Sequence, residues 1–208
     1  MLNNLGMVYG RQRMPEAVEC FEQALAIYRD LGDVRGESRA ATNVASAYLD
    51  LSRFSEALEA AQRSLAIQRR AEKRYGEGIA LGIIGAASRE LGRFSEAIDH
   101  QQAALAIFRE LGDRMTEADA LSDLGEAYLG LGRVDRAIDS LSESLAIWQG
   151  IGDRFGQAAT LRRLARAQQL TGEVDQARIS LRQALRLFEE LGDHADADEV
   201  RRLLAGIG

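Results

Sequence analysis

Small and apolar residues recur along the chain at intervals of forty residues. One alanine position is occupied by Ala17, Ala57, Ala97, Ala137 and Ala177, and a leucine follows eight residues later in every copy, at Leu25, Leu65, Leu105, Leu145 and Leu185. A second small position precedes each alanine, at Gly6, Ala45, Gly85, Gly125 and Ala165. Several markers that keep one register predict an internal repeat, and each copy predicts two helices that pack through their small residues.

Glycines divide the copies into these helices. Gly92, Gly132 and Gly172 are expected to close the first helix of a repeat, and Gly32, Gly112, Gly152 and Gly192 the second, because glycine tolerates the left-handed conformation that ends helices. An aspartate follows each glycine of the second set and is expected to cap the next helix. Pro15 fits the start of a second helix. The second repeat departs from this pattern, with Ala71-Glu72-Lys73 in place of Leu-Gly-Asp.

The pattern predicts an all-α chain of ten helices in five pairs, followed by a short closing helix. The repeats run approximately over residues 1–32, 33–73, 74–112, 113–152 and 153–192, the closing helix over 194–206, and the whole of 1–208 is expected to form one array. A single pair cannot bury its apolar face alone, so neighbouring pairs must stack into a solenoid. The chain has 208 residues but only one proline, and good helix formers dominate it, in agreement with this fold class.

Two segments of the first helices carry a resemblance to a known family. Gly125-Glu126-Ala127-Tyr128 with Ala137, and Ala45-Ser46-Ala47-Tyr48 with Ala57, resemble the tetratricopeptide repeat. The forty-residue form is similar to the repeats of kinesin light chains, of LGN/Pins adaptors and of bacterial regulators with tetratricopeptide arrays. The resemblance implies a right-handed superhelix whose first helices line a concave face, and it implies protein or peptide binding there without naming the ligand.

Charge and composition limit the possible partners. The net charge is −6 and no long basic block exists, which disfavours a general nucleic-acid surface. No apolar run approaches the roughly 20 residues needed to cross a bilayer. The single cysteine, Cys20, fits a reducing compartment, so we expect a cytoplasmic protein, and the arginine- and alanine-rich sequence suggests a bacterial source. Because the sequence begins inside a helix pattern, we also expect it to be part of a longer array.

If the first helices line a concave face, their residues that do not pack form the candidate groove. Counting positions relative to the small residue of each repeat gives the predicted ligand-binding residues Asn4, Met7, Arg39, Thr42, Asn43, Ser46, Ile79, Ile83, Asp119, Asp123, Glu126, Arg162, Arg163 and Arg166. Asn3, Gly82, Ala86, Ser122 and Ala159 belong to the same face. The polarity changes along the array from amides to a small apolar stretch, then to acids, then to bases.

Each part of this face has two interpretations. Asn4 and Asn43 either grip a peptide backbone, since an amide both donates and accepts, or are merely solvated. Arg163 and Arg166 either clamp a carboxylate or phosphate, or pair with Asp123 and Glu126, which lie one repeat earlier. The apolar stretch around Ile83 either receives a hydrophobic anchor or packs within the array.

Catalytic motifs and metal-ligand clusters are missing from the sequence. His100 and His194 are the only histidines, and neither has an acid or cysteine at ligand spacing. No nucleophile triad, HExxH motif or phosphate-binding loop is present, so no enzyme, cofactor or metal is expected. Tyr28, Phe108, Trp148 and Phe188 share one repeat position, which indicates packing rather than nucleotide stacking.

The sequence therefore predicts a scaffold that binds a protein or peptide in the groove of its first helices. One alternative is a sensor module of a larger signalling or transcription regulator, which an upstream extension of the reading frame would support. Another is self-assembly into a homo-oligomer through exposed array ends, which a monomer at all concentrations would exclude.

Overall fold

The computed structural model describes residues 2–11 and 14–207, and all regular secondary structure in this part of the chain is helical. Met1 and Arg13, which the sequence assigns to the first repeat, lie outside the described residues, as does Gly208. The helices fall into two compact units that divide between Leu111 and Gly112. This division lies one residue before the predicted boundary between the third repeat, 74–112, and the fourth, 113–152.

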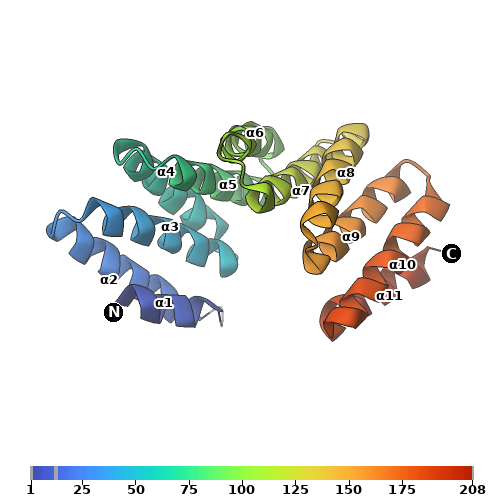
Figure 1. Ribbon diagram of the computed structural model, residues 1–208, viewed down its shortest axis with the longest axis horizontal. Helices are drawn as coiled ribbons and strands as arrows, with labels where there is room; N and C mark the ends of the chain where they lie inside the picture. Colours follow the sequence, from blue (N-terminus) through green and yellow to red (C-terminus); the bar gives the residue numbers. More distant parts are fainter. Residues whose placement is uncertain (1, 12–13, 208) are drawn as a thin grey trace. The chain divides into compact units, whose positions relative to one another are not determined.

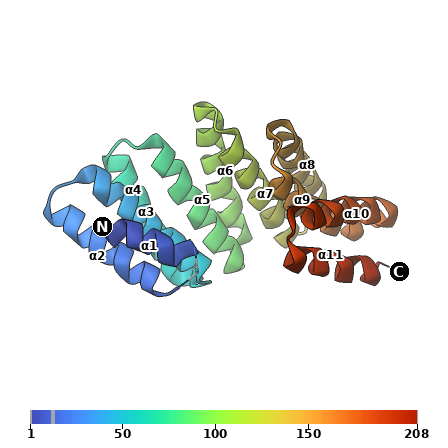
Figure 2. The ribbon, with the colours of Figure 1, turned by 60° about the horizontal axis from the view of Figure 1, so that its bottom comes forward.

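The first unit contains three consecutive helix pairs (Figures 1 and 2, blue to green). Its first helices are α1 (Leu2–Arg11), α3 (Val34–Asp50) and α5 (Arg74–Glu90), and its second helices are α2 (Glu16–Asp30), α4 (Phe54–Arg70) and α6 (Phe94–Leu111). Each helix packs against the next one along the chain, and α3 also packs against both α1 and α5. The second helices make no comparable contacts with one another among the described residues, so the first helices form the tighter layer of this unit.

The second unit repeats this arrangement with two pairs and a closing helix. It contains α7 (Arg114–Gly130), α8 (Val134–Ile151), α9 (Arg154–Leu170), α10 (Val174–Leu191) and α11 (His194–Gly206). Consecutive helices pack together, and the two first helices α7 and α9 are again in contact. Figure 2 shows α11 lying alongside α10, where Val200 and Ala197 are fully buried against the apolar core around Phe188.

The predicted small-residue seams are present in both units. Every alanine of the series Ala17, Ala57, Ala97, Ala137 and Ala177 is at most 1% exposed, and the facing small residues are also buried. The contact is close: a methyl group on Gly85 would lie 2.8 Å from Gln101 Cγ, and one on Gly125 would lie 2.7 Å from Leu141 Cγ. In the second repeat, where Ala45 replaces the glycine, the residue at the Leu141 position is the small Ala61. The second and fourth repeats thus combine a larger residue on one helix with a smaller one on the other, whereas the fifth repeat combines Ala165 with Leu181.

The predicted helix ends are also confirmed. All seven glycines expected to close helices have positive φ, from 66° to 80°. In the second repeat, Ser52 and Glu72 adopt the same backbone conformation, with φ of 57° and 53°. Asp33, Asp113, Asp153 and Asp193 accept the predicted capping bonds from the N–H groups of Gly36, Thr116, Gly156 and Asp196, over 2.8–3.2 Å.

Candidate ligand-binding face

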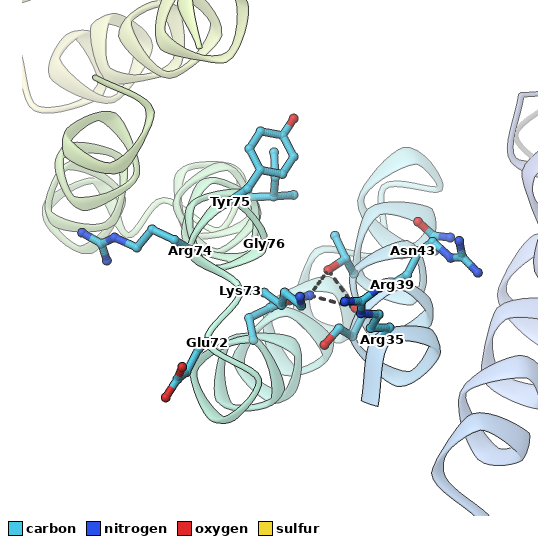
Figure 3. A pocket seen from close by; sticks show the side chains of 12 residues that line it. Arg35, Arg39, Asn43, Glu72, Lys73, Arg74, Tyr75 and Gly76 are labelled. Atoms are coloured by element: carbon cyan, nitrogen blue, oxygen red, sulfur yellow. Dashed lines mark hydrogen bonds between the residues drawn. The ribbon is translucent and has the colours of Figure 1, made fainter. Parts of the chain in front are cut away.

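A cleft of about 700 Å³ opens on the first-helix layer of the first unit, between α3 and the start of α5. Four predicted groove residues line it: Arg39, Thr42, Asn43 and Ile79. Figure 3 shows Arg35, Arg39 and Asn43 projecting from α3, and Lys73, Arg74 and Tyr75 from the start of α5. The remaining lining residues, which the sequence analysis did not select, are Arg35, Ser38, Gln68, Glu72, Lys73, Arg74, Tyr75 and Gly76.

The floor of the cleft is a network of hydrogen bonds. The buried Gln68 amide donates from Nε2 to the Ser38 carbonyl and to Thr42 Oγ1, each over 2.8 Å, as the dashed lines in Figure 3 show. Thr42 Oγ1 also lies 3.1 Å from Ser64 Oγ. The hydroxyl of Ser38 is buried and has no hydrogen-bond partner. The floor is therefore rigid, but it leaves one polar group unsatisfied.

The walls of the cleft carry an excess of positive charge. Arg35, Arg39 and Lys73 are exposed, and none of the described residues pairs with their side chains. Arg74 differs, because it binds Glu110 over 2.8 Å and Glu77 over 3.0 Å. In Figure 3 the side chains of Arg74 and Glu72 point away from α3. The free charges that face the cleft are therefore mostly cationic.

The cleft opens where the second repeat departs twice from the other repeats. Gln68 occupies the position of Tyr28, Phe108, Trp148 and Phe188, of which the last three are buried as the sequence predicted. Trp148 lies against the first turn of the next helix, where a methyl group on Gly156 would be 2.4 Å from the indole ring. Gln68 lies equally close to the first turn of α5, since a methyl group on Gly76 would be 2.2 Å from its Oε1, but it brings an amide where the others bring a ring. The sequence contains this signal, since one amide interrupts a series of aromatic rings.

The other predicted residues of the first unit occupy different environments. Asn43 Nδ2 donates to Asn3 Oδ1 over 3.0 Å, so its amide is held by the preceding first helix. Asn4 and Met7 are exposed on α1, and Ser46 is half-buried on α3. Ile83 is only 7% exposed and belongs to the core of the unit, which agrees with the packing interpretation of the apolar stretch.

In the second unit the arginines pair with acids of the preceding repeat, as one of the two interpretations predicted. Arg163 Nη1 lies 2.6 Å from Ser122 Oγ and 3.8 Å from an oxygen of Asp123. Arg166 Nη1 lies 3.5 Å from a carboxylate oxygen of Glu126. These bonds hold neighbouring first helices together and occupy the groups that a ligand would need.

Arg162 has partners that the sequence analysis did not identify. Its Nη1 binds Asp196 over 2.6 Å and Glu199 over 2.8 Å, both on α11. These partners lie 34 and 37 residues after Arg162, so the forty-residue register that pairs Arg163 with Asp123 does not identify them. Arg162 also lines a smaller cleft of about 260 Å³, whose charged lining residues are three arginines and two glutamates.

The pKa of Asp119, an acid of this face, lies above its ordinary value. Burial of the carboxyl and then the negative charge of Asp123 raise the pKa of Asp119 to about 6, while Arg163 lowers it in part. The residue as a whole is exposed to solvent. The like charge of Asp123 therefore contributes more to the raised pKa of Asp119 than burial does.

Metal-binding groups and membrane-spanning helices are both absent from the described residues. Within residues 2–11 and 14–207, no group of three or more histidine, cysteine or acidic side chains is placed to hold a metal ion. None of the helices in that part is long and apolar enough to span a bilayer.

Comparison with solved structures identifies chains of the same fold. A putative kinesin light chain from Podosopora anserina with nearly identical TPR-like repeats superposes with a TM-score of 0.73 at 22% identity, over 92% of this chain and 95% of that one. A Rap protein complexed with Competence and Sporulation Factor gives 0.71 at 20% identity, over 99% of this chain and 62% of that one. A STAND protein with a tetratricopeptide repeat sensor, from Pyrococcus horikoshii, gives 0.81 at 17% identity, over 96% of this chain and 31% of that one.

Sequence comparison gives the family. No curated protein is significantly similar to this sequence. The tetratricopeptide repeat profile, however, matches residues 1–70, 76–150 and 116–190. These matches cover most of the sequence and the stacked pairs have the architecture of the solved relatives, so the chain belongs to the tetratricopeptide repeat family.

Proposed function

We propose that the protein is a non-enzymatic scaffold that holds an extended peptide segment of a partner on its first-helix layer. The observation that supports this most is the cleft between α3 and α5, because four residues predicted from the repeat register line it. Tetratricopeptide repeats generally mediate protein–protein interaction, and a cleft on the first-helix layer supports such a role.

The lining of the cleft suits a peptide. Its volume of about 700 Å³ lies in the range of ligand sites, which are roughly 300–1,000 Å³. Asn43 donates to Asn3 through Nδ2, and its Oδ1 offers an acceptor to the N–H of a peptide backbone. Ile79 and the exposed ring of Tyr75 offer apolar contact beside the charged groups.

Selection from a displayed library of random decapeptides tests this proposal. We expect the wild-type protein to enrich defined sequences, and we expect Arg39→Glu combined with Thr42→Arg to abolish binding of the selected peptides. Arg182→Glu on α10 is the control, since Arg182 is exposed and lies outside both clefts. Equal binding by the cleft variant and the wild type would place the ligand elsewhere.

The same scaffold also fits a sensor module of a larger regulator, the second function that we consider. The STAND relative contains a tetratricopeptide repeat sensor, and this chain covers 31% of that protein. A reading frame that continues upstream into an ATPase or DNA-binding domain would favour this function. A stop codon directly upstream would remove it and leave the free-standing scaffold.

Self-assembly is the remaining proposal carried over from the sequence. Sedimentation across a hundredfold range of concentration distinguishes it. A single monomeric species throughout would exclude a homo-oligomer, whereas a concentration-dependent increase in mass would support one.

A further inference from the structure

A second recess of the first unit, the α2–α4 groove, lies between the second helices α2 and α4, over the first helix α3. Leu25 and Ile67 line it from α2 and α4, and Ala41 and Val44 line it from α3. None of its lining residues belongs to the cleft between α3 and α5. Its volume of about 240 Å³ is below the roughly 300–1,000 Å³ of ligand pockets, so it suits one inserted side chain better than a small-molecule ligand.

The second repeat carries a short residue in the floor of this groove. Ala41 occupies the position of Leu81, Leu121 and Leu161, all of which are buried. A leucine at this position would fill part of the space that Ala41 lines. The groove therefore has room for an aliphatic side chain, and its apolar lining would make van der Waals contact with one.

An isoleucine on α10 interrupts a series of exposed acids. Ile179 is 47% exposed, whereas the other repeats have at its position Glu19, Glu59, Asp99 and Asp139. Asp175 precedes it by four residues and Arg182 follows it by three, so the three side chains share one face of α10, and all are exposed. A single exposed apolar residue needs no explanation by itself, but this one lies between an acid and a base.

The α2 wall of the groove carries a matching series of side chains. Glu22, Leu25 and Arg29 line the groove at spacings of three and four residues. The face of α10 has the same spacings when it is followed in the opposite direction. An antiparallel α10 that places Ile179 opposite Leu25 therefore places each charged neighbour of Ile179 opposite a charge of the other sign.

The charges of the groove are accessible for such a contact. Glu22 accepts a hydrogen bond from the Tyr48 hydroxyl through Oε1, over 2.8 Å, which leaves its other oxygen available. Arg29 lies 3.5 Å from Glu37, and 62% of its side chain is exposed. Exposed pairs of this kind change partners at little cost. Arg63 adds an exposed cation from α4, and none of the described residues pairs with it.

We propose that the α2–α4 groove receives Ile179 of a second copy of this chain. This inference rests on the self-assembly proposal and names its contact, and it is independent of peptide binding on the first-helix layer. The two sides of the contact are different surfaces, so a pair of copies keeps one free groove and one free isoleucine and can add further copies. Because a contact with a single anchoring side chain buries little area, we expect association in the micromolar range.

Sedimentation of the wild type from about 5 μM to about 500 μM should show an increase in mass with concentration. Ala41→Leu fills the groove with the residue of the later repeats, and Ile179→Asp restores the acid of the other repeats. Each variant should weaken association by at least about tenfold. Met115→Asp is the matched control, because it also replaces an exposed apolar residue, 53% exposed, by an acid, and it should associate like the wild type.

An equimolar mixture of the two variants gives the decisive result. Ala41→Leu keeps its isoleucine and Ile179→Asp keeps an open groove, so together they should form a heterodimer and no larger species. Thermal melting checks that Ala41→Leu is folded, as we expect since leucine is accommodated at this position in the later repeats. If it is not folded, Ala60→His, which copies His100 of the third repeat, narrows the groove from α4 instead.

The outcomes separate this inference from the self-assembly on which it rests. A wild type that is monomeric at every concentration removes both. Association that survives Ala41→Leu or Ile179→Asp, or a mixture that does not pair, overturns this contact and leaves self-assembly through another surface. Peptide selection uses protein concentrations below this association, so Arg182→Glu remains a control for peptide binding there.

Discussion

At the scale of single residues, the seam between the two helices of a repeat is set by compensating volumes. Gly125 faces Leu141, while Ala45 occupies the equivalent position in the repeat that carries Ala61. Because protein interiors are close-packed, one added methyl group must displace its neighbour. The two residues of a seam contact should therefore be considered together when one of them is replaced.

Gly125→Ala tests this compensation. We expect a loss of about 1–3 kcal/mol of stability, since the new Cβ would lie 2.7 Å from Leu141 Cγ. The double variant Gly125→Ala with Leu141→Ala copies the pair of the second repeat. Its loss should be smaller than the sum of the two single losses, measured by urea denaturation. Additive losses would show that the two positions do not share one space.

The substitution Ser52→Gly, in contrast, should stabilise the protein. It has φ of 57° at a position where the later repeats have Gly92, Gly132 and Gly172. Left-handed backbone is unfavourable for residues with a Cβ, so Ser52→Gly should raise stability by about 1 kcal/mol. Ser55→Gly, within helix α4, serves as the contrasting control and should lower stability. Thermal melting of the two variants checks both signs.

Asp119 should make the stability of the second unit depend on pH. Its folded pKa of about 6 lies above the ordinary value of 3.8, so its ionisation opposes folding. The penalty is absent below pH 3.8, grows as the pH rises towards 6, and then stays constant. The facing charges are Asp123, Arg163, Asp153 and Asp113.

Asp119→Asn should remove this penalty. Because the side chain is exposed and screened by solvent, we expect a gain of only about 1 kcal/mol or less at pH 7.5, and none near pH 3.8. Chemical denaturation at a series of pH values measures the difference. A gain that does not change with pH would indicate a cause other than ionisation.

At the scale of elements, repetition determines how much of the structure can be predicted from the sequence. The eleven helices and the four aspartate caps follow from local signals that recur, so any single ambiguity is resolved by the other copies. The pairs Arg163–Asp123 and Arg166–Glu126 follow from the repeat length alone. The cleft does not, because it lies where Gln68 and Lys73 differ from the residues that the other repeats have at these positions. A pattern derived from all five repeats does not include residues that differ in a single repeat.

The sequence analysis did not identify the ion pairs of Glu37 and Glu77, which lie in the first turns of α3 and α5. Glu37 is 7% exposed and binds Arg70 over 2.7 Å and Arg29 over 3.5 Å, and Glu77 in the next repeat binds Arg69 over 2.8 Å. The two acids share one repeat position. Arg29 and Arg69 lie on the preceding second helix, whereas Arg70 lies on α4, the second helix of the same repeat as Glu37. Such pairs are found only when the packing of consecutive helices is known.

At the scale of the whole molecule, each unit has a core of its own, and the closing helix completes that of the second unit. Val200 and Ala197 on α11 are fully buried beside Phe188, which is also fully buried. A chain ending at Asp193 exposes this apolar surface of α10. We expect the truncated chain to lose stability and to self-associate, which calorimetry and light scattering measure. Leu203→Ser, at a residue 39% exposed, should have little effect.

The junction between α4 and α5 also has a consequence for protein design. Two departures from the other repeats meet there, Gln68 in place of an aromatic ring and Ala71-Glu72-Lys73 in place of Leu-Gly-Asp, and Gln68, Glu72 and Lys73 line the cleft. Because the junctions of a repeat array share one backbone plan, we expect that these few residues, transferred to another junction, would place a second cleft at a chosen number of repeats from the first.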